Sequence, residues 1–134
     1  MDLKLSHSFL FVHDQDAALT FYRDVLGLEV RTDATMEHMR WLTVGAASQP
    51  DIEINLMKVG PPVPEPDHDA LNALLAKGSL GSIIFVTDDV HKVFETVRAS
   101  GAEVLQEPID QGYGVRDCAF RDPSGNQVRF SQRL

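Results

Sequence analysis

The chain has 134 residues, of which 43% are hydrophobic and 24% charged, a balance typical of one compact globular domain that needs no disulfide or structural metal. Its formal net charge is −8. Because an acidic surface repels phosphate backbones, we do not expect a nucleic-acid partner. No apolar stretch reaches transmembrane length and the N-terminus lacks the pattern of a signal peptide, so no membrane partner is expected and the expected location is the cytoplasm.

The first half of the chain predicts a strand, a helix and three further strands, in that order. Residues 5–12 form a short apolar run rich in Phe, which is typical of a buried strand. Asp14 is placed to cap the helix that follows, because its carboxylate can accept hydrogen bonds from free backbone N–H groups, and Gly27 ends that helix. Three further strands are expected at residues 28–31, 38–44 and 51–59.

The second half repeats this order after a proline-rich linker. Residues 60–69 contain four prolines and predict no regular element, while a short helix is expected over residues 69–77. An apolar strand over residues 81–87 and a helix over residues 90–99 then follow. Three more strands are expected at residues 102–105, 114–120 and 126–132, the last two joined by the turn sequence Asp122-Pro123-Ser124-Gly125.

An internal repeat relates the two halves. The segment Phe11-Val12-His13-Asp14 matches Phe85-Val86-Thr87-Asp88, and Gly27-Leu28-Glu29-Val30 matches Gly101-Ala102-Glu103-Val104, both at a shift of 74 residues (85 − 11 and 101 − 27). Asp88, or its neighbour Asp89, therefore takes the capping place of Asp14. The sequence predicts an α+β fold of two tandem βαβββ modules within a single domain, residues 1–134. The modules cover about residues 1–60 and 79–134, with a linker helix region at 61–78.

Two motifs carry a resemblance to a known family. They are Phe21-Tyr22-Arg23-Asp24-Val25-Leu26-Gly27-Leu28 after the first strand and Phe120-Arg121-Asp122-Pro123-Ser124-Gly125-Asn126 before the last. With these motifs inside a duplicated chain, the sequence resembles the vicinal oxygen chelate superfamily, which includes glyoxalase I, bleomycin-resistance proteins and extradiol dioxygenases. The resemblance implies a curved mixed sheet in which strands of both modules line one cup.

The family often binds a divalent metal at four positions, on the first and fourth strands of each module. Mapped onto this sequence, these positions are His7 and Ser82 on the first strands and Glu53 and Arg129 on the fourth. A protonated Ser82 hydroxyl is a poor ligand, and the permanently cationic guanidinium of Arg129 offers only donors. We therefore predict no metal and no other cofactor, and expect Arg129 to pair with Glu53 or with an anionic ligand. A divalent metal held by His7 and Glu53 is the alternative.

Several cup residues have a second interpretation. Strand alternation places His7 on one face with Phe9 and Phe11, where His7 either lines the pocket or is structural. Glu53, between two isoleucines, faces either solvent or a polar partner. Trp41, the only tryptophan, either stacks on a flat ligand or fills the core. The predicted ligand-binding residues are His7, Phe9, Trp41, Glu53, Asn55, Ser82, Tyr113, Arg116 and Arg129.

Three side chains of the second half also leave alternatives open. Arg116, like its counterpart Arg40, either binds an anion or pairs with a nearby acid such as Asp117. Tyr113 lies in a loop that either closes over a ligand or stays exposed. Cys118 lies in an apolar stretch, which predicts a buried and unreactive thiol. Because neither Ser82 nor Cys118 has an evident partner base, no catalytic residue is assigned.

These residues favour a protein that binds a small organic ligand without a catalytic metal, in antibiotic or metabolite sequestration. By analogy with the family, such a protein is expected to be a homodimer. The first alternative is a divalent-metal-dependent lyase, isomerase or dioxygenase that uses His7 and Glu53. The second is a metal-free enzyme in which Glu53 acts as a general base.

Overall fold

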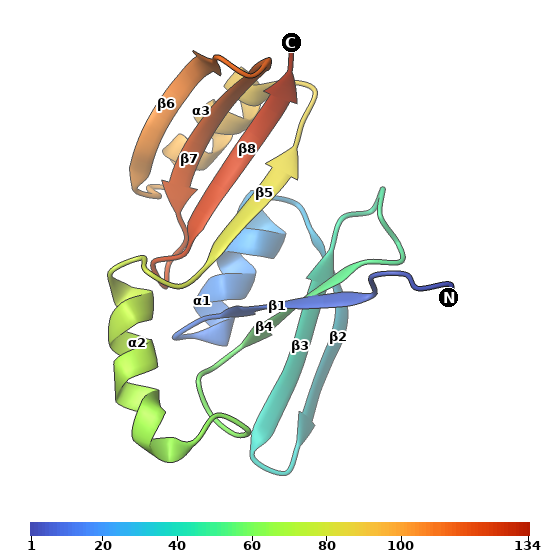
Figure 1. The fold of residues 1–134 in the computed structure, drawn as a ribbon, viewed down its shortest axis with the longest axis vertical. Helices are drawn as coiled ribbons and strands as arrows, with labels where there is room; N and C mark the ends of the chain where they lie inside the picture. The colour runs from blue at the N-terminus through green and yellow to red at the C-terminus, as the bar shows by residue number, and fades with distance from the viewer. The chain divides into compact units, whose positions relative to one another are not determined.

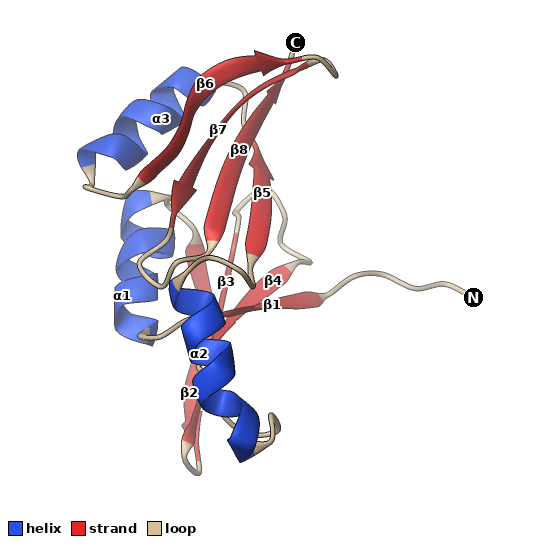
Figure 2. Ribbon diagram, turned by 60° about the vertical axis from the view of Figure 1, so that its left-hand side comes forward, coloured by secondary structure: helices blue, strands red, loops and turns tan.

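A computed structural model describes residues 1–134, which form two compact units, Met1–Asp69 and Ala70–Leu134. Each unit contains a four-stranded sheet with a helix on one face (Figure 1). Figure 2 shows the same arrangement with helices and strands in different colours. No helix has the length and apolar character that crossing a membrane requires. The one-domain organisation and the module bounds predicted from the sequence stay predictions.

The first unit has the element order of a βαβββ module. Its elements are β1 (His7–Phe11), α1 (Gln15–Leu19), the π-helical segment η1 (Thr20–Val25), β2 (Glu29–Met36), β3 (Met39–Gly45) and β4 (Glu53–Met57). The strand order in the sheet is β1-β4-β3-β2, with β1 parallel to β4 and the other pairs antiparallel. As predicted, Asp14 caps α1, since its Oδ1 accepts from the backbone N–H groups of Asp16 (2.8 Å) and Ala17 (3.0 Å).

The core of the first unit lies between α1–η1 and one face of the sheet. Tyr22 and Leu56 are fully buried there, and the rings of Phe21 and Tyr22 meet edge to face with centroids 4.9 Å apart. Gly27 follows with φ 78°, a conformation that glycine adopts without steric cost and that turns the chain into β2. Because alternate strand residues point to opposite faces, burying this face leaves the other for polar side chains.

The second unit repeats the order. Its elements are β5 (Ser82–Val86), α3 (Val90–Ala99), β6 (Val104–Gln111), β7 (Val115–Arg121) and β8 (Gln127–Arg133), and the helix α2 (His68–Ala76) precedes them. The strand order is β5-β8-β7-β6, with β5 parallel to β8. Asp89, one of the two predicted caps, accepts from the backbone N–H of Lys92 (3.1 Å). Phe94 of α3 packs on Phe120 of β7 with ring centroids 5.4 Å apart.

The turn before β8 is held together by one buried aspartate. Asp122 Oδ1 accepts from the backbone N–H groups of Ser124 (2.9 Å), Gly125 (3.0 Å) and Asn126 (3.0 Å). Gly125 has φ 113°, and a Cβ there would overlap the carbonyl oxygen of Leu75 in α2. The family motif around this turn is therefore a scaffold element that fixes the end of α2 against β8.

The structure confirms the α+β class and the two modules, and it extends two predicted strands. The strand expected at residues 28–31 runs to Met36, and the one expected at 102–105 runs to Gln111. Both extensions are hydrogen-bonded to the next strand, and in β6 the register shift between Gln106 and Ile109 accommodates Pro108. The predicted linker contains one 3₁₀ turn, Glu65–Asp67.

Candidate functional site

The candidate site of the first unit is the sheet face opposite α1, which we call the open face. The register pairs His7 with Glu53 and Phe9 with Asn55 across the parallel strands β1 and β4, so these side chains share one side of the sheet. The neighbouring strand β3 adds a second aromatic residue, because the ring centroids of His7 and Trp41 lie 6.4 Å apart. Phe9 is 58% exposed although it is a large apolar residue.

Glu53 is a partly buried carboxylate with few partners. Thr43 Oγ1 donates a hydrogen bond of 2.6 Å to its Oε1, and His7 Nε2 lies 3.4 Å from its Oε2. The side chains of His7 and Glu53 are 44% and 25% exposed. Since an ionised carboxylate offers about four acceptor positions, Glu53 can still accept from a donor on a bound molecule.

Asn55 is the least satisfied polar residue of the open face. The residue is 4% exposed, and its Oδ1 has no hydrogen-bond partner. Its Nδ2 donates only to the thioether sulfur of Met57 at 3.7 Å, which is a weak acceptor. A buried carbonyl oxygen without a donor costs about 1–3 kcal/mol, so a hydroxyl or N–H group brought into contact with it would recover part of that free energy.

The equivalent face of the second unit is satisfied from within. Arg129 Nη1 lies 3.0 Å from Asp117 Oδ2 and donates to Gln106 Oε1 at 3.1 Å. Asp117 Oδ1 also accepts from the side-chain amides of Gln106 (2.8 Å) and Gln111 (2.9 Å). Burial would raise the pKa of Asp117, but these amides and the charge of Arg129 outweigh it and hold that pKa below its usual range. Arg129 thus has a carboxylate partner in its own sheet, and a pairing with Glu53 stays a prediction.

The sheet registers also show which fourth-strand residues correspond. Ser82 pairs with Gln127 as His7 pairs with Glu53, and Arg129 pairs with Ile84 as Asn55 pairs with Phe9. By register, the counterpart of Arg129 is therefore Asn55 and that of Glu53 is Gln127. The mapping from the sequence treated Glu53 as the counterpart of Arg129, which is two residues away from the counterpart that the register gives. The error was not visible in the sequence, because Glu53 and Asn55 are two residues apart and therefore point to the same face of the strand.

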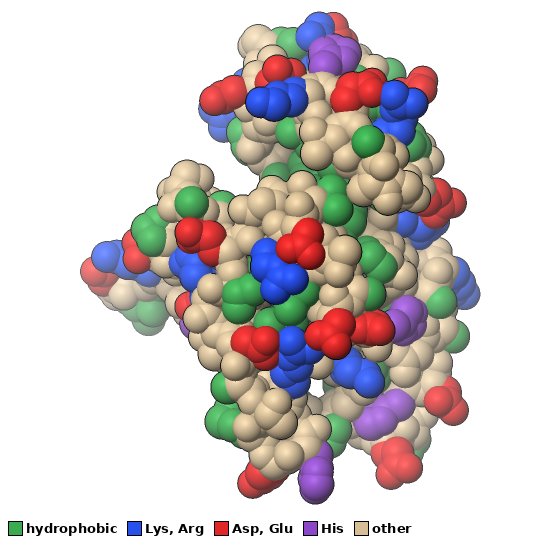
Figure 3. All heavy atoms as spheres, turned by 180° about the vertical axis from the view of Figure 1, so that it is seen from behind, with side chains coloured by type: hydrophobic (Ala, Val, Ile, Leu, Met, Phe, Trp, Pro, Cys, Tyr) green, Lys and Arg blue, Asp and Glu red, His purple; other side chains and the backbone are tan.

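The remaining arginines that were considered as anion sites pair with acids on their own units. Arg116 Nε donates to Asp110 Oδ1 at 2.6 Å, which agrees with the alternative of pairing with a nearby acid, although that acid is Asp110 and not Asp117. Arg40 contacts Asp33 (2.8 Å) and Asp16 (2.7 Å). Figure 3 shows the same pattern on one face, where Lys and Arg side chains lie among Asp and Glu side chains.

Three further predicted residues lie in the second unit. Ser82 begins β5 and is exposed, and Tyr113 is 73% exposed in the turn between β6 and β7. Cys118 is fully buried, and burial raises the pKa of its thiol to about 11, which agrees with the prediction of an inert cysteine. None of the three has a hydrogen-bond partner that would make it a nucleophile.

The side chains at the family's metal positions do not fit a catalytic metal centre. Such a centre needs three or four N, O or S ligands with one position left for substrate. The first unit offers His7 and Glu53, whereas the second offers the hydroxyl of Ser82 and, at the position mapped from the sequence, the cation of Arg129, which pairs with Asp117. Gln127, the counterpart of Glu53 by register, has only a neutral amide. The structure contains no group of three or more His, Cys, Asp or Glu side chains arranged to hold a metal ion.

The sequence analysis did not select the residues that complete these faces. Thr43, Gln106 and Gln111 were missed, and Asp117 was named only as a possible partner of Arg116, because these residues act through neighbours on other strands. A sequence signal existed for Thr43 alone, since it follows Trp41 by two residues and therefore shares its face.

The chain contains two βαβββ modules. Each has a mixed sheet with a helix on one face and polar side chains on the other, which is the architecture of the class of duplicated βαβββ proteins. Within this class, the family model of the Glyoxalase/Bleomycin resistance protein/Dioxygenase superfamily matches residues 4–130. The chain belongs to this superfamily.

Individual relatives cover nearly the whole chain. The crystal structure of UcmS2 is 38% identical, covers 98% of each chain and has a TM-score of 0.88. TnmS3, an antibiotic binding protein from Streptomyces sp. CB03234, is 26% identical, covers 99% of this chain and 98% of its own, and has a TM-score of 0.77. The lactoylglutathione lyase of Haemophilus influenzae is 31% identical over 96% of this chain and 91% of its own length.

Proposed function

We propose that this protein binds and sequesters a small organic ligand, an antibiotic or a metabolite, on the open face of its first unit and without a catalytic metal. The observation that carries the proposal is the buried Oδ1 of Asn55, which has no hydrogen-bond partner and lies in register with the exposed ring of Phe9. A polar group left unsatisfied beside exposed aromatic rings is typical of a site that is completed by its ligand.

The open face favours a ligand that donates hydrogen bonds. Glu53 is an acceptor, and the free atom of Asn55 is an acceptor too, so the matching groups are hydroxyl or N–H groups. The rings of Phe9, Trp41 and His7 suit an aromatic body. The earlier expectation of an anionic ligand depended on Arg129, whose charge is already paired with Asp117. We therefore favour a neutral or cationic aromatic ligand.

The relatives support a binding role. TnmS3 is described as an antibiotic binding protein, and its fold matches nearly all of this chain. From the resemblance to the superfamily, we also propose that the protein acts as a homodimer in the cytoplasm. Light scattering on the purified protein measures the first point, and a molar mass of one chain would contradict it.

The binding proposal is tested by thermal shift with a panel of aromatic and glycopeptide antibiotics, bleomycin among them. At 100 times its Kd, a ligand adds about 2.7 kcal/mol of stability, which raises the melting temperature by several degrees. The matched variant is Asn55→Leu, which removes the free acceptor and keeps a side chain of similar size. The proposal requires at least one ligand whose effect shrinks in this variant. If no member of the panel raises the melting temperature, the proposal fails.

One observation favours a metal-dependent lyase as the second candidate. His7 and Glu53 lie 3.4 Å apart, and a lactoylglutathione lyase is among the relatives. Elemental analysis after addition of Ni²⁺, Zn²⁺ or Fe²⁺ separates the two candidates. About one metal ion per chain, lost in His7→Ala, would favour the lyase, whereas less than about a tenth of an ion per chain would favour the binding protein.

A further inference from the structure

The open face continues along its sheet as a row of methionines. Met57 follows Asn55 by two residues in β4, and Met39 precedes Trp41 by two residues in β3, so both point to the same side of the sheet as those residues. Met36 of β2 is paired in register with Met39 across the turn and shares its side. Three of the four methionines of the chain therefore lie on the open face.

The methionines adjoin the polar end of this face. Asn55 Nδ2 lies 3.7 Å from the thioether sulfur of Met57, and the Oδ1 of the same Asn55 is the buried acceptor without a partner. Further toward the hairpin tip, Met36 is 53% exposed and Met39 41% exposed. An apolar surface thus begins at the free acceptor and extends to the tip of the β2–β3 hairpin.

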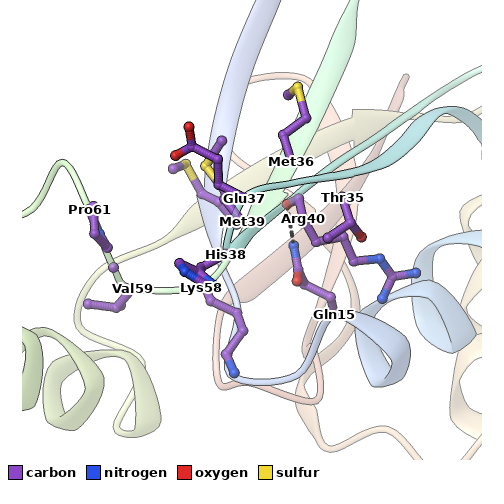
Figure 4. Close-up of a pocket in the computed structure, with 12 residues that line it drawn as sticks. Gln15, Thr35, Met36, Glu37, His38, Met39, Arg40, Lys58, Val59 and Pro61 are labelled. Carbon is purple, nitrogen blue, oxygen red and sulfur yellow. Dashed lines mark hydrogen bonds between the residues drawn. The ribbon is translucent and has the colours of Figure 1, made fainter.

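Beside these methionines the sheet is open between β3 and β4. Toward the hairpin tip, the register pairs the two strands only as far as Thr43 and Asn55. Beyond that pair, Gln15 of α1 joins the strands, since its Nε2 donates to the carbonyl oxygens of Arg40 (3.1 Å) and Leu56 (2.9 Å). The opening has a volume of about 810 Å³ and all three methionines line it (Figure 4). This volume is within the range of about 300–1,000 Å³ that is common for small-molecule sites.

The basic side chains near the hairpin lie away from the methionines. In Figure 4, Met36 points to one side and Lys58 to the other. Arg40, which alternates with Met39 along β3, pairs with Asp16 of α1 at 2.7 Å on the helix side of the sheet. The methionine side therefore offers thioethers and not cations, which suits an uncharged ring system.

The second copy of the module lacks this row. By register, the counterpart of Met57 is Ser131 in β8. Near the tip of the β6–β7 hairpin, the amide of Gln111 donates to Asp117 in the same sheet at 2.9 Å. No methionine occurs in the second unit. The methionine surface is thus a feature of the copy in which Asn55 has a free acceptor.

We propose that Met36, Met39 and Met57 form a subsite for the far end of an elongated, flat aromatic ligand whose hydroxyl or N–H group is held at Asn55. The inference rests on the function proposed for the open face and adds the shape of its ligand. On β3, Thr43 lies opposite Asn55 and Met39 is four residues further along, about 13 Å away at about 3.3 Å per residue. A single ring does not span this distance, whereas several fused rings do. Unbranched, polarisable thioethers adapt to the faces and edges of such rings.

The test compares 2-aminoanthracene, which has three fused rings, with aniline, which has one ring and the same amino donor. Protein labelled with ¹³C at the methionine methyl groups gives one signal per methionine, assigned by Met→Leu variants at positions 36, 39 and 57. We expect 2-aminoanthracene to shift the signals of Met36, Met39 and Met57 along one saturation curve. At saturation, aniline is expected to shift only Met57, which contacts Asn55. Met1, which is fully exposed at the terminus, is the internal control and is expected not to move.

A variant at the hairpin measures what the subsite contributes to affinity. Met39→Gln keeps an unbranched side chain but removes the thioether, so the affinity for 2-aminoanthracene is expected to fall about fivefold and that for aniline to stay unchanged. The control is Leu105→Gln in the second unit, because Leu105 is 39% exposed and Met39 is 41% exposed. This control is expected to change neither affinity.

The outcomes separate the subsite from the function on which it rests. Unmoved signals of Met36 and Met39 while Met57 shifts, or equal effects of Met39→Gln on both probes, would overturn the subsite and leave the binding function of the open face intact. Failure of Asn55→Leu to change antibiotic binding would overturn that function itself.

Discussion

Asn55 and Arg129 occupy equivalent places in the two sheets, and the sheets treat them in opposite ways. In the first unit, Asn55 is buried with a free Oδ1 and lies in register with the exposed ring of Phe9. In the second unit, Arg129 contacts Asp117 and Gln106, and Asp117 accepts two further hydrogen bonds. One copy of the module thus has a polar face with a free acceptor, and the other copy fills the equivalent face with its own side chains. Changes in the second face should affect stability, and changes in the first should affect binding.

The largest effect is expected from Asp117→Asn. The substitution leaves the guanidinium of Arg129 half-buried without a carboxylate, and loss of one partner from a buried pair costs about 3–5 kcal/mol. Because asparagine keeps an acceptor oxygen, we expect a loss of about 2–4 kcal/mol in the free energy of unfolding. Urea denaturation measures it. The exposed pair Asp110–Arg116 gives the control, since Asp110→Asn should cost less than about 1 kcal/mol.

The second prediction concerns pH. The pKa of Asp117 is lowered in the folded protein, so the unfolded chain binds a proton at this group more readily than the folded one. Its contribution to stability is complete above the unfolded value of about 3.9 and is lost as the pH falls through the lowered folded value. Urea midpoints from pH 7 to pH 3 should fall more steeply for the natural protein than for Asp117→Asn. Parallel curves would contradict this account of the network.

A smaller effect of opposite sign is expected from Asn55→Leu. Removing a buried acceptor that has no partner leaves the free energy of unfolding unchanged or raises it by up to about 1 kcal/mol. If urea denaturation showed that Asn55→Leu lowers the free energy of unfolding as much as Asp117→Asn does, the proposed difference between Asn55 and Arg129 would be contradicted.

The smallest effect is expected at Cys118. The thiol is fully buried and its pKa is raised to about 11, so almost no thiolate is present at neutral pH. The folded protein should therefore react with a thiol reagent such as 5,5′-dithiobis(2-nitrobenzoate) only at its rate of unfolding. Rapid reaction of the folded protein would show that the core between this sheet and α3 is more open than the structure indicates.

Local chemistry made much of the fold predictable. Asp14, Asp89 and Gly27 act within one or two turns of their own helices, so their roles could be predicted from neighbouring residues. The ends of β2 and β6 could not, because pairing with the next strand sets them. The hydrogen-bond partners on the two polar sheet faces could not be predicted either, because they also come from neighbouring strands.

Residue type alone selected Glu53 and Arg129. Whether each is open or satisfied depends on Thr43 and Asp117, which lie on other strands.

The central claim is that the open face binds the ligand, and the fluorescence of Trp41 tests it most directly. Trp41 is the only tryptophan, and its ring centroid lies 6.4 Å from that of His7. The panel antibiotic with the largest thermal shift is titrated against the natural protein and Asn55→Leu. We predict a saturable change in Trp41 emission, with a Kd at least about tenfold weaker in the variant. Binding that leaves Trp41 emission unchanged, or that is equally tight in Asn55→Leu, would contradict the claim.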